Sequence, residues 1–319
     1  MLISVVIATL DRPGTLRDAV SSVAAQTYDN WQVVVVDDGS RPAVDARVLA
    51  ATLGERFVLC RHEACKGIPQ AKNAGLRAAS GDVVLHLDDD DLLAPRALEK
   101  IASAYAAHPE LDCLFLNVQP FGPFAPGAKE NQDGALRMLL SRVQTCNQDG
   151  LVFFEEGLFE ALLKSVPLAL QRPAARRSTW ARVGPFTEQL LFSEPDWTIR
   201  AAMTCRTALI EEPLSLWRCE GQNFASRPEK MYSALQNQTR AAELLLERVS
   251  QDKAQAGRID LARRYLADTR FNLAYYEAGH RRGSPWTNLC SSFVLAPEVR
   301  HVKLAARLAL GLRQRADTA

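Results

Sequence analysis

The chain has 319 residues, of which 47% are hydrophobic and 24% are charged, and its formal net charge is +1. This balance is typical of a globular protein, excludes an intrinsically disordered chain, and shows no excess of basic charge that would indicate nucleic acid as a partner. No apolar run approaches the roughly 20 residues that cross a bilayer. The apolar start, MLISVVIAT, lacks the basic region and the cleavage site of a signal peptide. We therefore expect a cytoplasmic protein, either soluble or peripheral on the inner face of the membrane.

Strand-like and helical patterns alternate along the first part of the chain. Runs rich in Val, Ile and Leu occupy residues 2–9, 32–38, 57–63 and 82–87, and helical patterns follow Pro13, cover 69–79 and start near Pro95. Continuous apolar strands that alternate with amphipathic helices predict an α/β fold with a mostly parallel sheet flanked by helices. Such sheets bind ligands at the carboxyl ends of their strands.

The later part of the chain is less regular. Residues 111–119 predict another strand, and the Pro/Gly-rich segment 121–134 predicts a surface loop, with a mobile lid or an acceptor-binding insertion as the alternative. A last strand is expected to end around Cys219, and almost everything beyond Pro228 has a helical pattern. We therefore predict two domains, a sheet domain at residues 1–225 and a helical appendage at residues 226–319.

Four consecutive aspartates, Asp88 to Asp91, form an acidic run after the apolar segment VVLHL. On an extended segment Asp88 and Asp90 project to one side and Asp89 to the other. This spacing suits a hard divalent cation, Mg²⁺ or Mn²⁺, which carboxylates bind together with the phosphates of a substrate. A calcium-binding loop fails, because two leucines stand where it needs an oxygen ligand and a glycine. A solvated helix N-terminus explains Asp91 well, but it explains four acids poorly.

A second acidic segment, VVVVDDGS, places Asp37 at the tip of another buried strand, followed by the turn residues Gly39 and Ser40. A carboxylate at such a tip can accept hydrogen bonds from a ribose or from a base N–H, as in dinucleotide-binding folds. The first strand, however, is followed by ATLDRPG rather than by G-x-G-x-x-G. This difference argues against a nicotinamide or flavin cofactor.

Together these segments resemble the family 2 glycosyltransferases, enzymes of the GT-A fold that use nucleotide-diphospho sugars. SVVIATLDRP is similar to the first strand and turn of the family, VVVVDDGS to its second-strand signature, and KGIPQAKNAGLRAASGDVVLHLDDDD to its third block. The third block is long and quite specific. The resemblance covers roughly residues 2–225 and leaves the helical appendage outside it.

The resemblance implies where a nucleotide sugar binds. Carried over position by position, it assigns the donor site to Thr9, Asp11, Asp37, Lys72, Asp88 and Asp89, and a metal ion, Mn²⁺ or Mg²⁺, to Asp88 and Asp90. Within this set Asp37 is expected to contact the base and Asp88 the ribose, while Gly75 allows close packing. Two departures from the family, Leu10 in place of an aromatic and Lys72 in place of an arginine, leave the choice of nucleotide open.

Another segment, VGPFTEQLLFSEPDWTIR, resembles the family block that holds the general base. Asp196, which precedes Trp197, matches the base, and Glu194 is the second choice because Pro195 stands where a glutamate usually lies. A base is needed because an acceptor hydroxyl is a weak nucleophile until its proton is taken. The alternative is that both acids cap the helix that starts near Trp197.

A later segment, LSLWRCEGQNFAS, is similar to a family block in which a histidine can bind the metal. Glu220 takes the place of that histidine, and the five histidines of the chain form no ligand spacing of their own. A carboxylate could serve a hard cation equally well. A solvated surface glutamate is the alternative, so the role of Glu220 stays open.

The segment PEVRHVKLAARLALGLRQR predicts a basic amphipathic helix near the end of the chain. It places several apolar residues among basic ones: Val299, Val302, Leu304, Leu308 and Leu312. Such a helix can lie on an anionic membrane surface, where a lipid-linked acceptor would be found. Packing against the preceding helices or against a second subunit is the plainer interpretation.

The activity that the resemblance implies is an inverting, metal-assisted transfer of a sugar, with a uridine diphosphate sugar as the expected donor and a hydroxyl of a glycan or lipid-linked glycan as the acceptor. One alternative is a nucleotidyltransferase, for which TLDRPGT is only a weak phosphate loop. Another is a non-catalytic relative that binds a nucleotide sugar, because Pro195 and Glu220 depart from the family pattern. The sugar, the linkage and the oligomeric state do not follow from the sequence.

Overall fold

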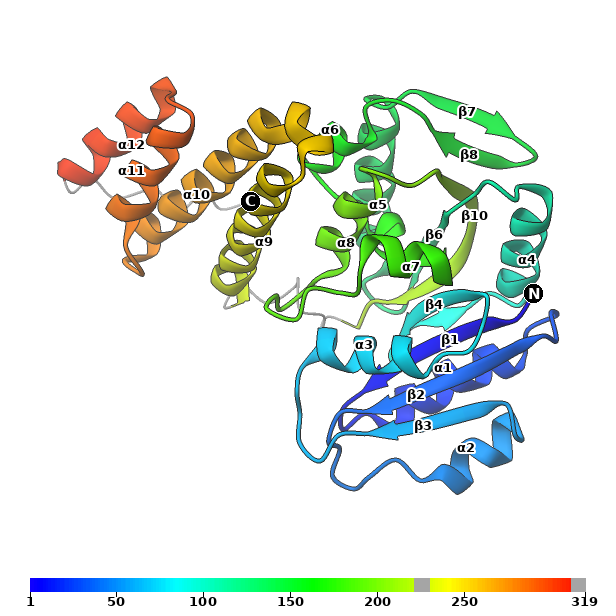
Figure 1. The fold of residues 1–319 in the computed structure, drawn as a ribbon. Coiled ribbons are helices and arrows are strands. Elements are labelled where there is room, and N and C mark those ends of the chain that lie inside the picture. The colour runs from blue at the N-terminus through cyan, green and yellow to red at the C-terminus, as the bar shows by residue number, and fades with distance from the viewer. Residues whose placement is uncertain (221–229, 311–319) are drawn as a thin grey trace. The chain divides into compact units, whose positions relative to one another are not determined.

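The computed structural model describes residues 1–220 and 230–310. Contacts divide the chain into two compact units, Met1–Asn223 and Phe224–Ala319. The first unit is an α/β domain around a central sheet, and the second is helical (Figure 1).

Within residues 1–220 the chain forms a ten-stranded sheet with the order β3-β2-β1-β4-β9-β6-β10-β8-β7, and β5 pairs with β10. The strands are β1 Ile3–Thr9, β2 Trp31–Asp37, β3 Phe57–Arg61, β4 Val83–Asp88, β5 Leu92–Leu93, β6 Cys113–Phe121, β7 Thr145–Gln148, β8 Leu151–Phe154, β9 Pro173–Arg176 and β10 Thr207–Arg218. Strands β3, β2, β1 and β4 are parallel, whereas β9 is antiparallel to both of its neighbours. The part of the sheet from β3 to β4 is therefore parallel, and the part beyond β4 is mixed.

Strands β1, β2 and β4 are almost entirely buried, because apolar residues follow one another without alternation and both faces of the sheet are covered. The helices of this unit are α1 Pro13–Ala24, α2 Ala46–Leu53, α3 Ile68–Ala78, α4 Ala97–Ala107, α5 Ala125–Leu140, α6 Leu158–Leu162, α7 Arg177–Val183 and α8 Glu194–Ala201, with a short 3-10 helix, η1 Leu168–Gln171. A core cluster joins the strands to α1 and α4 through residues such as Val5, Val20, Val33 and Leu98.

The parallel register brings the carboxyl ends of three strands to one edge of the sheet. Thr9 at the end of β1 pairs with Asp37 at the end of β2, and Ala8 pairs with Asp88 at the end of β4. The acidic run leaves the sheet at this edge. Residues that are far apart in the sequence therefore meet there.

Helix α3 lies close to the sheet because Gly75 has no side chain. A Cβ atom at Gly75 would overlap Val6 Cγ1 of β1 and lie 3.1 Å from Val36 Cγ2 of β2. We expect Gly75→Ala to lower the free energy of unfolding by about 1–3 kcal/mol, since buried strands must shift to relieve the overlap. Denaturant unfolding measures this change, with Gly127→Ala as the control because a Cβ there meets nothing within 4 Å. A Gly75→Ala variant as stable as the wild type would contradict the close packing.

The segment 121–134 is not the surface loop that its Pro/Gly content predicts, while its role as a lid or an acceptor-binding insertion stays a prediction. Most of it belongs to helix α5, which has Pro126 in its first turn and buries Leu136 and Leu139. Proline is tolerated in the first turn, because the N–H that it lacks would have no partner inside the helix. Burial of the two leucines outweighs the weak helix propensity of the glycines, and the prediction of a surface loop is wrong.

The second unit is helical, as the sequence predicts. Its helices are α9 Met231–Gln251, α10 Ile259–His280, α11 Pro285–Leu295 and α12 Val299–Ala309, with a 3-10 helix, η4 Lys253–Arg258, between the first two. Helix α10 packs against α9 and α11. Ala274, Leu289 and Leu304 form a core shared by α10, α11 and α12. In the described part of the chain, no helix combines the length and the apolar character that a membrane span requires.

Candidate functional site

The ends of β1 and β4 are joined by a direct hydrogen bond. Thr9 Oγ1 donates to Asp89 Oδ2 at 2.7 Å, across 80 residues of sequence. Both residues belong to the donor site predicted from the sequence. The fold therefore places the first strand and the acidic run at one point.

Basic side chains offset the repulsion within the acidic run. Lys72 Nζ donates to Asp88 Oδ1 at 2.7 Å. Arg12 Nη1 lies between two further carboxylates, 3.1 Å from Asp89 Oδ1 and 3.0 Å from Asp90 Oδ2. Opposite charges at these distances offset part of the repulsion between the consecutive aspartates.

Asp91 belongs to the interior of the domain. Its Oδ2 pairs with Arg172, and its Oδ1 accepts a hydrogen bond of 3.0 Å from the backbone N–H of Arg218. It precedes strand β5 rather than a helix, so the alternative interpretation of Asp91, a solvated helix N-terminus, is wrong. Because Arg172 immediately precedes β9, this ion pair ties the acidic run to the middle of the sheet.

The side chains of the acidic run alternate between solvent and interior. Those of Asp88 and Asp90 are 42% and 32% exposed, whereas those of Asp89 and Asp91 are 7% and 1% exposed. The outward pair is the one predicted to bind Mg²⁺ or Mn²⁺, and carboxylate oxygens are suitable ligands for both ions. Within residues 1–220 and 230–310 no three His, Cys, Asp or Glu side chains are grouped to hold an ion. Oxygens from phosphate or water would therefore have to complete the coordination.

The surrounding charges shift the protonation of this cluster. Burial opposes ionisation of Asp88, but Lys72 and Arg172 outweigh it and hold the pKa of Asp88 well below its usual range. Burial and the Asp88 carboxylate raise the pKa of Asp90. Burial alone would lower the pKa of Lys72, yet Asp88 and Glu194 raise it above its ordinary value. Lys72 is therefore a permanent positive charge next to the outward carboxylates.

A cavity of about 450 Å³ opens beside the acidic run. Thr9, Asp11 and Arg12 line one side of it, and residues 40–45 line another. Apolar residues of α1 and α2 complete the wall: Leu16, Val20, Val48 and Leu49. Thr9 and Arg12 contact both the acidic run and the cavity, so the two adjoin. An apolar wall with a few polar groups at its rim suits a flat heterocycle that carries a polar tail.

Asp37 is not among the described residues that line this cavity, but it holds the loop 40–45, which does line it. It is fully buried; its Oδ1 accepts from the backbone N–H of Ser40 at 2.8 Å and its Oδ2 from that of Val44 at 3.0 Å. Arg61 pairs with the same Oδ2. The Asp37 carboxylate is thus committed to the loop 40–45, and its direct contact with a base stays a prediction.

Asp38 anchors the neighbouring loop in the same manner. His62 Nδ1 lies 2.6 Å from Asp38 Oδ1, and the backbone N–H groups of Lys66 and Gly67 donate to the carboxylate at 3.0 and 2.9 Å. This loop leads into α3, which carries Lys72. Two adjacent aspartates therefore fix two loops at the same edge of the sheet.

Asp11 connects the turn after β1 to the loop 40–45. Its backbone N–H donates to Ser40 Oγ at 3.0 Å, and its Oδ1 accepts from the backbone N–H of Arg41 at 2.7 Å. Its φ of 55° lies in the left-handed region, which aspartate tolerates better than most residues. Asp11 thus closes the rim of the cavity where the sequence predicts donor contact.

Glu194, at the start of α8, is the acidic side chain of that helix that meets the cluster. Its carboxylate pairs with Lys72 Nζ, which also donates to Asp88. Asp196 lies two positions further along the same helix, about 200° around its axis. The structure therefore brings the second-choice base to the acidic run and turns Asp196 away from Glu194.

Asp196 is buried in a separate network. Its Oδ2 accepts hydrogen bonds from Thr187 Oγ1 at 2.7 Å and from Arg200 Nε at 3.0 Å. The Arg200 guanidinium also donates to the backbone oxygens of Val183 and Pro185 at 2.6 and 2.9 Å. These contacts tie α8 to the segment before it. They give Asp196 a structural role, while its role as a base stays a prediction.

The sequence prediction omits Arg12 and Arg172, the partners of Asp90 and Asp91. Arg12 stands in the quoted segment ATLDRPG, and its basic charge at the end of a strand was the available signal. Arg172 had no such signal, because antiparallel β9 brings it next to β4 from far along the chain.

Glu220 forms an ion pair with the nearby Arg218. Arg218 Nη1 lies 3.2 Å from Glu220 Oε1, and its Nη2 lies 2.9 Å from Asp18 Oδ2. Arg218 Nε also donates to the backbone oxygen of Asp90 at 2.8 Å. Residues 221–229, which complete the family-like block around Glu220, lie outside the described part of the chain.

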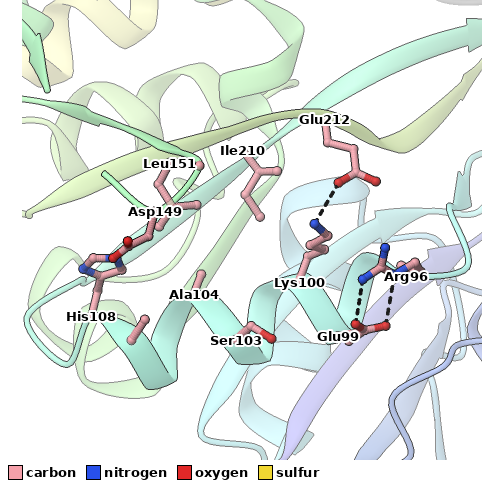
Figure 2. A pocket seen from close by; sticks show the side chains of 12 residues that line it. Arg96, Glu99, Lys100, Ser103, Ala104, His108, Asp149, Leu151, Ile210 and Glu212 are labelled. Atoms are coloured by element: carbon pink, nitrogen blue, oxygen red, sulfur yellow. Dashed lines mark hydrogen bonds and ion pairs between the residues drawn. The ribbon is translucent and has the colours of Figure 1, made fainter. Parts of the chain in front are cut away.

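A second hollow, of about 300 Å³, lies along α4 beside β8 and β10 (Figure 2). Charged side chains along it pair with one another: Lys100 Nζ lies 3.2 Å from Glu212 Oε2, and Arg96 Nη2 lies 2.9 Å from Glu99 Oε1. None of the site residues predicted from the sequence lines it. This hollow is therefore not part of the predicted donor site.

The sequence profile described as glycosyl transferase family 2 matches residues 4–155. A curated protein of Escherichia coli, UDP-Glc:alpha-D-GlcNAc-diphosphoundecaprenol beta-1,3-glucosyltransferase WfgD, is 35% identical over 98 residues, which are 31% of this chain and 38% of that protein. The O-antigen biosynthesis protein RfbC of Myxococcus xanthus is 30% identical over 175 residues, which are 54% of this chain and 12% of that protein. The matched parts thus span less than two fifths of these relatives.

Solved structures resemble this chain over most of its length. S. aureus TarS 1–349 in complex with UDP-GlcNAc has a TM-score of 0.64 at 18% identity, covering 95% of this chain and 84% of that one. The mannosyltransferase PcManGT from Pyrobaculum calidifontis in complex with GDP-Man and Mn2+ has a TM-score of 0.54 at 17% identity, covering 96% and 84%. At such identities the likeness concerns the fold, which is that of a GT-A domain followed by helices.

Proposed function

Since this chain belongs to glycosyl transferase family 2 through residues 4–155, we propose that it transfers a sugar from a nucleotide-diphospho sugar to a hydroxyl of a glycan or lipid-linked glycan. The observation that carries this proposal is the placement of two outward carboxylates, Asp88 and Asp90, beside the cavity at the sheet edge. A nucleotide sugar needs such a pair of subsites, one for the nucleoside and one for the charged diphosphate.

The nucleoside is proposed to occupy the cavity between Thr9 and the loop 40–45. Its apolar wall would cover the base, while Asp11 and Ser40 stand at the polar rim. Uridine diphosphate is the proposed nucleotide, because the names of the E. coli relative and of the TarS complex both include a UDP-sugar. The lipid-linked acceptor in the name of the E. coli relative supports an acceptor of that class, reached from the cytoplasmic side of a membrane.

The diphosphate is proposed to lie near Asp88 and Asp90, whose carboxylates would hold Mn²⁺ or Mg²⁺. When bound, the ion would stabilise the negative charge that grows on the departing nucleoside diphosphate. Arg12 adds a second positive charge there, since it contacts Asp90, lines the cavity and keeps a side chain that is 54% exposed. Its contact with Asp90 lies partly in solvent, so Arg12 can turn towards a phosphate at little free-energy cost.

We assign the general base to Glu194, in place of the Asp196 favoured by the sequence. Glu194 shares Lys72 with Asp88, so it lies on the same side as the proposed donor, and its side chain retains 15% exposure. The ion pair with Lys72 fixes the position of the Glu194 carboxylate. A single carboxylate that takes the proton of the acceptor hydroxyl supports direct displacement, and hence inversion at the sugar.

Thermal-shift measurements with a panel of nucleotide sugars, with and without Mn²⁺, test the proposal. A donor at a hundredfold excess over its Kd is expected to stabilise the protein by about 2.7 kcal/mol, which raises Tm by roughly 2–4 °C. The selected donor is then incubated with acceptors, and release of nucleoside diphosphate is measured. Pyrophosphate exchange with a nucleoside triphosphate would instead indicate a nucleotidyltransferase. Binding without any release of diphosphate would indicate a non-catalytic relative.

A further inference from the structure

Helix α11 carries an exposed apolar stripe. Trp286, Cys290, Phe293 and Val294 are all exposed, and their spacing places them on one face of the helix. Val294 is 80% exposed. The sequence of α11, PWTNLCSSFVL, contains no charged residue. Large apolar side chains gathered in this way are unusual on a surface that meets only water.

Helix α12 continues this surface with a second stripe. Val299, Val302 and Leu310 are 73%, 63% and 70% exposed, and the exposed Ala306 lies between the last two. Lys303 and Arg307 are exposed beside this stripe. The outward side of α12 is thus apolar along its length and bordered by positive charge.

The inner sides of α11 and α12 pack in one core. Leu289 of α11 and Leu304 of α12 both pack with Ala274 of α10 in one core. Ser292 Oγ and His301 Nε2 lie 2.7 Å apart between the two helices. Both exposed stripes lie outside this shared core. We call this surface the outer face of α11 and α12.

This outer face differs from the face expected from the sequence. Leu304 is buried and Leu308 packs against the core, so these two leucines do what the plainer interpretation predicts and hold α12 to its neighbours. Val299 and Val302 are outward instead. Leu312 lies outside the described residues.

Charge decides which partner fits the outer face. Residues 281–310 contain one acidic residue, Glu298, and five basic ones, Arg281, Arg282, Arg300, Lys303 and Arg307. Arg300 pairs with Asp268 and Glu298, but no ion pair in the described ranges 1–220 and 230–310 involves Lys303 or Arg307. A second copy of this face would bring like charges together, which is unfavourable. Anionic lipid headgroups would instead pair with them, while acyl chains cover the apolar stripes.

We propose that the outer face of α11 and α12 docks on a bilayer that contains anionic lipids. The apolar stripes enter the boundary between headgroups and acyl chains, Trp286 lies at headgroup level, and Lys303 and Arg307 pair with lipid phosphates. A docked protein would meet a lipid-linked acceptor, and this one point rests on the proposed function. Docking itself requires no transfer reaction.

Vesicle sedimentation of the full chain tests the proposal. We expect the protein to sediment with vesicles of equal parts phosphatidylcholine and phosphatidylglycerol and to remain in solution with phosphatidylcholine alone. The double variant Lys303→Glu/Arg307→Glu is expected to lower the apparent vesicle affinity by about tenfold or more. Arg248→Glu/Arg264→Glu is the matched control, since it changes the net charge by the same amount at exposed sites on α9 and α10. This variant is expected to keep binding to the vesicles. Val299→Ser/Val302→Ser is expected to weaken binding while leaving the charges unchanged.

Other outcomes would overturn the proposal. The proposal is overturned if the wild-type protein stays in solution with both vesicle types. It is also overturned if the Lys303/Arg307 variant binds the vesicles as well as its control does. A dimer in light scattering that dissociates on Val299→Ser/Val302→Ser, without vesicle binding, would assign the outer face to a second copy. Donor-induced thermal shifts are measured on every variant. Vesicle binding by a protein that shows no shift with any nucleotide sugar would overturn the proposed function and leave docking intact.

Discussion

Replacing Glu194 by glutamine is expected to lower kcat for sugar transfer by about 10²- to 10⁴-fold, which is the usual contribution of a general base. The amide keeps the size of the side chain but cannot take the proton of the acceptor hydroxyl. Lys72 retains its bond to Asp88 in the variant, so the fold and the donor affinity are expected to persist. Initial rates with saturating donor, together with the thermal shift produced by that donor, measure both quantities.

Asp196→Asn is the informative comparison for Glu194→Gln. Because Asp196 and Arg200 form a buried ion pair, the substitution removes the charged partner that Asp196 provides and is expected to lower the free energy of unfolding by about 3–5 kcal/mol. Rates are therefore compared well below the Tm of this variant, where it is folded. If Asp196→Asn kept its stability and donor affinity but lost turnover, while Glu194→Gln stayed active, the base would be Asp196.

Asp90→Asn is expected to abolish the stimulation by Mn²⁺ and to lower turnover by about 10²- to 10³-fold, the usual effect of losing one stabilising group at a charged transition state. Asp90 is one of the two outward carboxylates of the acidic run, and an amide is a weak ligand for a hard cation. Calorimetric titration with UDP in the presence and absence of Mn²⁺ measures the loss of metal-dependent binding.

The stability of the Asp90→Asn variant separates metal binding from folding. The Asp90–Arg12 pair lies partly in solvent, so its loss is expected to change the free energy of unfolding by less than about 1 kcal/mol. Asp133→Asn is a suitable control, because Asp133 forms an exposed pair with Lys129 on α5, outside the proposed site. Mn²⁺ dependence that survives in Asp90→Asn would exclude Asp90 as a metal ligand.

The parallel strands and the outward pair in the acidic run follow from local patterns. Continuous apolar runs predicted β1, β2 and β4, and the alternation of side chains on an extended segment predicted that Asp88 and Asp90 share a side. Both are properties of a few neighbouring residues. They can be read without knowledge of the rest of the fold.

The orientation of Glu194 and Asp196 could not be predicted in the same way. Both acids lie in the first turn of α8, and which one meets Lys72 depends on how the whole helix is rotated against α3. That rotation depends on contacts that α8 makes with the segment before it, such as those of Asp196 with Thr187 and of Arg200 with the backbone oxygens of Val183 and Pro185. Arg172 escaped prediction for a similar reason, since its pairing with Asp91 arises only when β9 enters the sheet.

Asp37 and Asp38 have a consequence for how this protein could change its substrate. Each carboxylate holds the main chain of a different loop, through N–H groups that every residue except proline possesses. Side chains on those loops can therefore be exchanged while the path of the backbone is retained. New donor preferences are accessible by point substitutions in the loop 40–45, which lines the cavity, whereas replacing Asp37 would release that wall of the cavity.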